Sequence, residues 1–330
     1  MIGEDHLVGW LRTHAGTSLI GDDAAVLPAG GPFAVTVDSQ IAGVHFTPDL
    51  DPALLARRLL AVNLSDLAAM GALPAYAFLA LSAAPGFDHR RFFRALLAAC
   101  RRAALHLAGG DLAASPHTVA TLTLLGTKPP EGRWLLRSGA APGHDLWLGG
   151  TVGESAAGGL LITRGARLHG ARSIDLPSWM PAALHAPARR AVRRHLLPAA
   201  QLDLGLWLGH QREGAALDVS DGVARDLHRL CRESGTGALI EAEDLPFADR
   251  FHRLCGTLAA DPLELALGGG EDYVLLFTLP PDVAPPARFG CRKIGQITRQ
   301  KRIRLRQAGA VRPLAALGWD HLAQQKTPAR

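Results

Sequence analysis

The residues of this 330-residue chain that best suit chemistry are carboxylates at the ends of apolar segments. Six short acidic motifs share this position: Gly21-Asp22-Asp23, Thr36-Val37-Asp38, Asn63-Leu64-Ser65-Asp66, Gly109-Gly110-Asp111, Asp218-Val219-Ser220-Asp221-Gly222 and Gly269-Gly270-Glu271-Asp272. One carboxylate beside a glycine is usual in a turn or a helix cap. The prediction of a common site therefore depends on the group as a whole.

Asp66 is the most informative of these carboxylates. It interrupts an otherwise apolar stretch, residues 59–70, that we expect to be helical and buried. An unpaired buried carboxylate is costly, so Asp66 requires a cation or strong hydrogen-bond donors. Asn63 lies one turn earlier on the same helix face. The alternative is a buried hydrogen-bond network without a ligand.

Two further carboxylates end predicted strands. Asp38 follows the apolar run 33–37, and Asp218 follows the run 215–217. Ligands of α/β proteins usually bind at strand ends. Ser220 and Asp221 then open a predicted helix, where they could cap the first turn or lie beside a bound phosphate.

Clustered carboxylate oxygens suit Mg²⁺, and Mg²⁺ in turn suggests a polyphosphate substrate such as ATP. The chain has no GxxxxGK[ST] motif, and its four lysines lie outside glycine-rich loops. Metal ions and backbone N–H groups would therefore neutralise most of the phosphate charge. Arg137 is a candidate cation for the nucleotide phosphates, the alternative being a surface arginine in a linker.

The elements that must position these residues alternate between strands and helices, which predicts an α/β or α+β fold. Strands are expected at 33–38, 117–126, 145–149, 215–219, 237–242, 272–279, 291–297 and 302–307. Helices are expected at 52–70, 88–107, 154–164, 186–196, 222–234 and 247–258. Residues 165–185 are expected to form a loop or insertion. A turn-rich stretch after residue 128 places a domain boundary near residue 135.

Composition narrows the class of protein. The net charge of +5 permits a nucleic-acid partner, but the arginines are dispersed and aromatic residues make up only 5% of the chain, so we expect no nucleic acid. The chain contains no uninterrupted run of about 18 apolar residues, so we expect no membrane span. The N-terminus does not resemble a signal peptide, and the four cysteines form no paired motif, which favours a cytoplasmic protein.

The order of the motifs resembles the thiamine-monophosphate kinases of the aminoimidazole ribonucleotide synthetase superfamily. The stretches that carry the resemblance are 21–27, 38 with 42–46, 61–72, 109–111, 137–143, 218–222, 269–273 and 318–321. The run Ala-Val-Asn-Leu-Ser-Asp-Leu-Ala-Ala-Met-Gly-Ala at 61–72 is highly specific. The other stretches are individually weak and jointly strong.

The resemblance implies a two-domain fold. An N-terminal domain (1–135) would bind ATP and Mg²⁺ and pair its four-stranded sheet with a second copy in a homodimer. A larger C-terminal α/β domain (136–330) would follow. The implied reaction is in-line phosphoryl transfer from ATP to thiamine monophosphate.

The resemblance also implies residue roles. The implied Mg²⁺ ligands are Asp23, Thr36, Asp38, Asp66, Asp111, Asp218 and Asp221. Gly110, Asp111, Arg137 and Ser220 would contact ATP, and Asp38, Asp66, Asp111 and Asp221 would be catalytic through the ions that they hold. His45, Glu271 and Trp319 would face thiamine phosphate, since an indole can stack on a cationic ring and a carboxylate can balance its charge.

Four residues depart from the family pattern: Val37, Leu112, His144 and Val274. The acidic core is intact, so activity is still expected. The rivals are another ATP-dependent enzyme of the superfamily with a different acceptor, and a non-catalytic nucleotide-binding protein.

Overall fold

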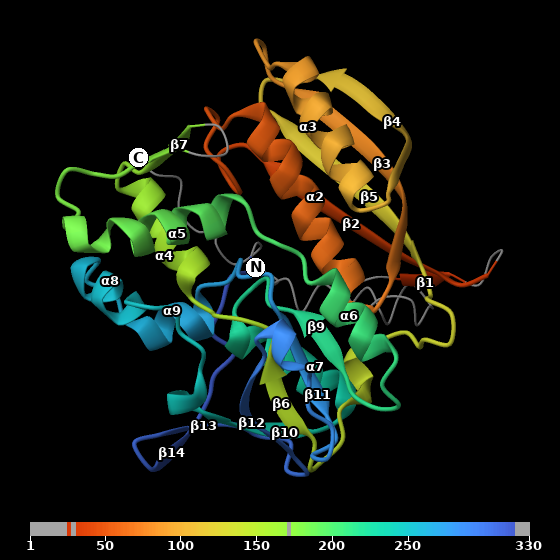
Figure 1. The fold of residues 1–330 in the computed structure, drawn as a ribbon, viewed down its shortest axis with the longest axis vertical. Coiled ribbons are helices and arrows are strands. Elements are labelled where there is room, and N and C mark those ends of the chain that lie inside the picture. Colours follow the sequence, from red (N-terminus) through yellow and green to blue (C-terminus); the bar gives the residue numbers. More distant parts are fainter. Residues whose placement is uncertain (1–24, 28–30, 170–172, 321–330) are drawn as a thin grey trace.

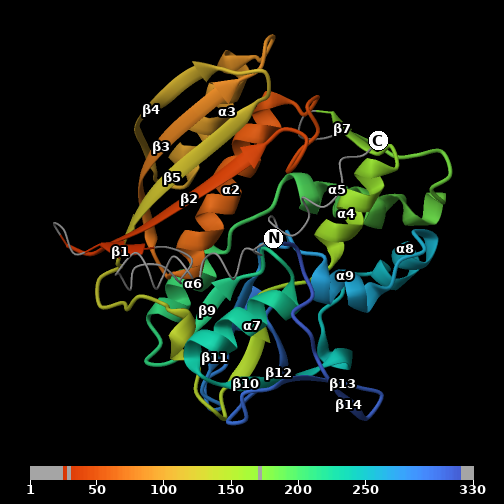
Figure 2. The same cartoon turned by 180° about the vertical axis from the view of Figure 1, so that it is seen from behind.

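The structure is a computed structural model that describes residues 25–27, 31–169 and 173–320. Two large β-sheets, the helices that pack against them and a short two-stranded hairpin make up this part of the chain (Figures 1 and 2). Asp23 of the first acidic motif lies outside the described residues, as does His321 of the C-terminal matching stretch.

The first sheet comes from the N-terminal part of the chain and has the strand order β1-β2-β5-β3-β4. Its strands are β1 (Ala25–Leu27), β2 (Phe33–Ile41), β3 (Leu73–Ala83), β4 (His106–Ala114) and β5 (Val119–Thr127). Helices α2 (Pro52–Ala69) and α3 (His89–Arg102) cover one face of this sheet (Figure 1). The other face carries exposed apolar side chains, including Val37, Tyr76 and Phe78.

The second sheet has the order β14-β13-β10-β12-β6-β11-β9. Its strands are β6 (Asp145–Leu148), β9 (Ala216–Asp218), β10 (Gly237–Glu241), β11 (Leu275–Leu279), β12 (Arg292–Thr298), β13 (Ile303–Gln307) and β14 (Ala310–Pro313). Central strand β11 is buried on both faces, and its side chains alternate between two apolar cores. One core contains α7 (Val223–Ser234), and the other contains α6 (Leu202–Gly209) and the C-terminal end of α2.

A separate group of helices packs beside the second sheet (Figure 1). Its main members are α4 (Glu154–Thr163), α5 (His185–Leu196) and α8 (Phe251–Thr257), and α9 (Pro262–Gly268) lies next to them. The short hairpin of β7 (Arg167–His169) and β8 (Ser173–Asp175) borders the same group. The remaining short elements are 3₁₀ turns at Arg137–Gly139, Ala182–Leu184, Ala242–Asp244 and Ala287–Phe289.

Helix α2 belongs to both halves of the molecule, because small residues near its C-terminal end permit close packing. Ala68 and Ala69 are buried against Ala216 of β9 and apolar side chains of β11. On the opposing helix, a Cβ at Gly205 would lie 2.0 Å from the carbonyl oxygen of Ala68. The motif that contains Asp66 is therefore held against the second sheet as well as the first.

The main elements expected from sequence are confirmed, with several corrections. Helix α3 ends at Arg102, because the following residues join the first sheet as β4, parallel to β3. Strand β3 was not expected, since its alternation of alanine with larger apolar residues does not distinguish strand from helix. The first sheet has five strands in the described residues, not four, because the short β1 pairs with β2. The segment 165–185 contains a hairpin and a 3₁₀ turn.

Candidate active site

The candidate site is bordered by two groups of residues. The first group, here called the first wall, comes from β2 and α2. Thr36, Asp38 and Gln40 alternate along β2 with Val37, which is 59% exposed on the open face of the sheet. Thr36 is buried, and its Oγ1 donates a hydrogen bond of 2.5 Å to Oδ2 of Asp66. The strand and the helix thus bring two of the predicted residues into direct contact.

The second group, here called the second wall, comes from the 218–222 loop at the end of β9 and from the 268–273 loop. Asp218 is 3% exposed at the last position of this strand, and Asp221 is 8% exposed three residues later. Arg229 on α7 forms an ion pair of 2.5 Å with Asp221. The cation also pairs with Asp226 at 2.9 Å, so one arginine holds two carboxylates.

Asp226 is a buried support for this wall. Its Oδ2 accepts a 3.0 Å hydrogen bond from the backbone N–H of Asp221. Burial, followed by the negative charge of Asp221, raises the pKa of Asp226 to about 7. The charge of Arg137 acts on Asp226 in the opposite direction, which places the predicted nucleotide-binding arginine near the 218–222 loop.

The glycine-rich loop 268–273 lies directly against the 218–222 loop. The N–H groups of Glu271 and Tyr273 donate to the carbonyl oxygens of Ser220 and Val219 at 2.7 and 2.9 Å. Glu271 and Tyr273 both have left-handed backbone conformations, with φ of 58° and 49°. Such values are uncommon outside glycine and indicate that the surrounding contacts fix the loop.

Asp272 of the same loop has a structural task. Its two carboxylate oxygens accept from the N–H groups of Gly153 and Ser155 at 2.7 and 3.2 Å. These donors belong to the first turn of α4, which has no side-chain cap of its own. Asp272 therefore caps α4 from a distance, and burial raises its pKa to about 7.

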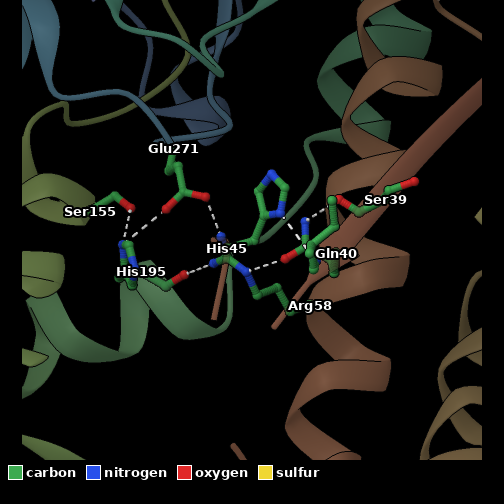
Figure 3. A network of polar contacts seen from close by, with 8 residues as sticks. Ser39, Gln40, His45, Arg58, Ser155, His195 and Glu271 are labelled. Carbon is green, nitrogen blue, oxygen red and sulfur yellow. Dashed lines mark hydrogen bonds and ion pairs between the residues drawn. The ribbon is translucent and has the colours of Figure 1, made fainter. Parts of the chain in front are cut away.

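Glu271 joins the two walls through a polar network (Figure 3). Its Oε1 accepts a hydrogen bond from Arg58 of α2, and its Oε2 lies 3.2 Å from Nδ1 of His195 at the end of α5. Arg58 also donates to Oε1 of Gln40 at 2.7 Å and to the carbonyl oxygen of His195. Burial raises the pKa of Glu271, but the nearby Arg58 cation and the histidines outweigh this effect and lower it overall.

The charges of further predicted residues act on Tyr273 and Glu271 of the 268–273 loop. Burial raises the pKa of Tyr273, and the charges of Glu271, Asp38 and Asp218 raise it further. Asp38 of the first sheet and Asp218 of the second therefore act on one phenol group. His45 is close enough to Glu271 to affect its pKa.

The ring of His45 has a defined orientation. Its Nδ1 accepts a 3.1 Å hydrogen bond from the N–H of Ile41, in the turn that follows β2. A neutral imidazole that accepts at Nδ1 carries its proton on Nε2. His45 can therefore present an N–H donor from the first wall.

Asp111 and Gly110 are not brought together with Asp38 inside one chain. The strand registers place Asp38, Leu122, Leu79 and Gly110 in one row across β2, β5, β3 and β4. Three strand spacings separate Asp38 from Gly110, about 14 Å. Asp111 pairs with Ala80, whose side chain lies on the open face of the sheet. The two carboxylates therefore cannot bind the same ion within one chain.

Trp319 approaches the second wall through its backbone. Its N–H donates to the carbonyl oxygen of Asp221 at 3.1 Å, and its side chain is 38% exposed. Gly318 is required before it, because a Cβ there would lie 2.3 Å from the same oxygen. The tryptophan thus lies beside the 218–222 loop, as the resemblance implies.

Sequence reasoning missed several residues that shape the site. They are Arg58, His195, Asp226 and Arg229. Only Arg58 carried a usable signal, since a charged residue inside an apolar helix requires a buried partner. The others are ordinary polar residues of amphipathic helices, and their partners come from distant segments.

The departures from the family pattern lie away from the Thr36–Asp66 contact. Val37 and Leu112 are exposed on β2 and β4. Val274 is fully buried, and its carbonyl oxygen accepts from the N–H of Val219. His144 is buried and lies 3.4 Å from Glu213. Val274 and His144 therefore serve packing of the second half.

The donor set of the site suits a hard cation. In the described ranges, no three His, Cys, Asp or Glu side chains lie close enough to bind one metal ion together. Thr36 of β2 is hydrogen-bonded to Asp66 of α2, and Asp38 of β2 and Asp218 of β9 both act on Tyr273. Asn63 adds a buried Oδ1 that accepts no hydrogen bond from any described residue, while its amide donates to Leu59. A buried carbonyl oxygen without a donor fits a cation.

A cavity of about 690 Å³ lies elsewhere, over β10, β12 and β13 of the second sheet. None of the predicted site residues lines it. A second hollow of about 370 Å³ is lined by Gly109, Gly110 and Asp111 together with Phe93 of α3. Within the described part of the chain, no helix has the length and apolar character needed to cross a membrane.

Comparison with known proteins defines the class first. Residues 21–127 match the family described as AIR synthase related protein, N-terminal domain. A solved structure described as AaThiL complexed with AMPPCP and TMP has a TM-score of 0.84 and 27% identity, and the match covers 97% of each chain. The two-sheet fold is therefore that of an AIR synthase-related protein.

Named relatives define the family more narrowly. The thiamine-monophosphate kinase of Escherichia coli strain K12 is 39% identical over 266 residues, which are 79% of this chain and 76% of that protein. The thiamine-monophosphate kinase of Synechococcus elongatus is 35% identical, over 92% of this chain and 91% of that protein. The chain belongs to the thiamine-monophosphate kinase family.

Proposed function

We propose that this protein transfers the γ-phosphoryl group of ATP to the phosphate of thiamine monophosphate, which yields thiamine diphosphate and ADP. The observation that carries the proposal is the meeting of family motifs at one place. Asp38 of the N-terminal half and Asp218 of the C-terminal half both act on Tyr273 of the 268–273 loop, and Asp66 accepts a hydrogen bond from Thr36 of the same strand as Asp38. The named relatives and the complex with AMPPCP and TMP support the same reaction.

Mg²⁺ is the proposed metal, held by carboxylate and hydroxyl oxygens. Its proposed ligands are Asp23, Thr36, Asp38, Asp66, Asp111, Asp218 and Asp221. When bound, Mg²⁺ would neutralise the charge of the polyphosphate and of the acceptor phosphate. Because Asp111 and Asp38 are about three strand spacings apart, they would hold different ions.

The chain's own residues would bind and orient the two substrates. Gly110, Asp111, Arg137 and Ser220 would contact the nucleotide. His45 would donate its Nε2 proton to a phosphate oxygen of the acceptor, and Trp319 would lie against its aromatic rings. The acceptor phosphate is already ionised at neutral pH, so the site needs no strong general base, and alignment of the reacting groups supplies much of the catalysis.

The reaction can be tested directly. Purified protein is incubated with ATP, Mg²⁺ and thiamine monophosphate, and thiamine diphosphate and ADP are measured by chromatography. Product in equimolar amounts is the expected result. ATP binding without product would indicate another acceptor, and neither product nor binding would favour the non-catalytic alternative.

Asp66→Asn tests the site. It keeps the size of the side chain and removes its negative charge, so we expect at least a hundredfold loss of kcat with unchanged thermal stability. Asp203→Asn on α6 is the matched control. Equal activity of Asp66→Asn and the parent would overturn the role of Asp66.

We further propose that the protein is a cytoplasmic homodimer of two-domain protomers, divided near residue 135. The four cysteines carry no disulfide, which suits a reducing compartment. The open face of the first sheet is the proposed dimer surface, because Val37, Tyr76 and Phe78 expose apolar area there. Asp111 lies at the same face, so the proposed nucleotide site adjoins the proposed interface.

A further inference from the structure

Arg58 is a fully buried cation in the middle of α2. Its guanidinium donates to acceptors from three separate segments: Oε1 of Gln40 on β2, the carbonyl oxygen of His195 on α5, and Oε1 of Glu271. Gln40 is itself only 2% exposed. A buried arginine is tolerated only when its donors are satisfied, and the rigid fork of the guanidinium fixes the geometry of its partners.

Glu271 is the partner that faces the proposed substrate. Its side chain is 26% exposed, whereas that of Arg58 is fully buried. An ionised carboxylate offers about four lone-pair positions. Among the described residues, Arg58 occupies one position and His195 a second, which leaves further acceptor positions on the exposed side.

His195 adds a neutral donor to this arrangement. Burial lowers its pKa to about 4, so the imidazole is uncharged at neutral pH. Its Nδ1 lies 3.2 Å from Oε2 of Glu271 and 3.3 Å from Oγ of Ser155. The proton on Nδ1 can therefore be donated to the carboxylate, and Arg58 is the cation that balances its charge.

We propose that Arg58 is a positioning residue for the acceptor substrate, an inference that rests on the proposed function. It ties the Glu271 carboxylate of the second wall to β2 and α2 of the first wall. The Arg58–Glu271 pair has no net charge, so Glu271 recognises thiamine monophosphate as a directed hydrogen-bond acceptor for an N–H or O–H group. Arg58 and His195 hold the Glu271 carboxylate in one direction (Figure 3), and this direction is the source of its specificity.

The test compares Arg58→Met, Arg58→Lys, Glu271→Gln and the double variant Arg58→Met/Glu271→Gln in the full-length protein. We expect Arg58→Met to raise KM for thiamine monophosphate about tenfold or more, with KM for ATP within about twofold. Arg58→Lys keeps the charge and should recover part of this loss. The double variant should be no worse than the poorer single variant, because both changes disrupt one interaction.

Arg57→Met is the matched control. Arg57 is the next residue of α2, it is not fully buried, and its charge acts on Asp51 at the start of the helix. We expect both KM values of this variant to equal those of the parent. If Arg58→Met instead lowers only the active fraction, or changes both KM values alike, Arg58 is merely structural and the proposal is overturned.

The parent, Arg58→Met, Glu271→Gln and the double variant are also unfolded thermally without substrate. Non-additive losses of stability in this cycle would support the Arg58–Glu271 link, and additive losses would contradict it. This readout is independent of catalysis. If the parent makes no thiamine diphosphate, the proposed function fails, while the stability cycle still decides whether the two residues act together.

Discussion

Single residues of this site have tasks that their motif does not reveal. Glu271 and Asp272 are neighbours in sequence, but they serve different purposes. Glu271 is partly exposed and pairs with Arg58, whereas Asp272 is fully buried and caps α4 through the N–H groups of Gly153 and Ser155. Of the two acidic residues of the motif, Glu271 therefore belongs to the site and Asp272 supports the fold.

The burial of Asp272 predicts a pH dependence of stability. Its pKa is about 7 in the folded protein and near 3.8 when unfolded, so the folded state binds the extra proton between these values. The contribution of Asp272 to the free energy of unfolding is fully present below pH ~4. It decreases as the pH rises towards 7, by at most about 1.4 kcal/mol per pH unit. Asp272→Asn cannot titrate and should lose less stability than the parent between pH 5 and 8.

Urea unfolding at both pH values measures this difference. Asp249→Asn, at an exposed carboxylate, is the control and should follow the parent. Because Asp226 titrates in both proteins, its contribution cancels in the comparison. Identical pH slopes for Asp272→Asn and the parent would show that Asp272 is ionised in the folded state.

At the scale of elements, α2 determines how the site is assembled. The helix holds Asp66 against Thr36 of β2 and Arg58 against Glu271, and its small C-terminal residues let α6 approach closely. The helix begins at Asp51, whose carboxylate caps it by accepting from the N–H of Ala53. A displacement of α2 would therefore move both the acidic residue and the positioning arginine.

Gly205→Ala tests this close packing. The new Cβ would lie 2.0 Å from the backbone oxygen of Ala68, so α6 and α2 must separate. We expect a loss of about 1–3 kcal/mol in the free energy of unfolding, measured in urea, and a lower kcat.

Gly256→Ala in α8 is the matched control, because no heavy atom lies within 4 Å of its added Cβ. We expect it to be neutral or to stabilise the protein by up to about 1 kcal/mol through helix propensity. Equal effects of the two substitutions would contradict the close packing of α6 on α2.

Sequence patterns predicted these elements unevenly. Asp51-Pro52 marked the start of α2 correctly because a cap and a first-turn proline are local signals. The helix expected at 88–107 runs two residues into β4, and the rest of that strand was not expected, since its pairing with β3 depends on a segment some 30 residues away. The acidic residues were predicted from their motifs, whereas the contacts of Arg58 and His195 come from tertiary packing and have no local pattern.

On the scale of the whole molecule, the open face of the first sheet is the main unpaired surface that we describe. Val37, Thr123 and Phe78 lie in one row across β2, β5 and β3. Helices α2 and α3 pack on the opposite face. A second copy of the chain is the proposed partner, and Asp111 lies at the same face.

Phe78→Glu tests the dimer. A charge on this face should convert a dimer of the parent into a monomer, as measured by sedimentation. Val311→Glu on β14 is the control, because Val311 is similarly exposed, at 46% compared with 41% for Phe78. A monomeric parent, or a dimeric Phe78→Glu protein, would overturn the proposed surface.

The passage of α2 through two cores has a consequence for how the molecule unfolds. Residues of the N-terminal half, Ala68 and Ala69, are buried in a core whose other members are Leu135 and residues of α6, β9 and β11. Unfolding of the second sheet would expose the C-terminal end of α2 to solvent. Unfolding of α2 would leave a cavity in the core that it shares with the second sheet. The second core is not formed by residues of one half alone. The two sheets therefore unfold in a single cooperative transition, despite the apparent linker near residue 135.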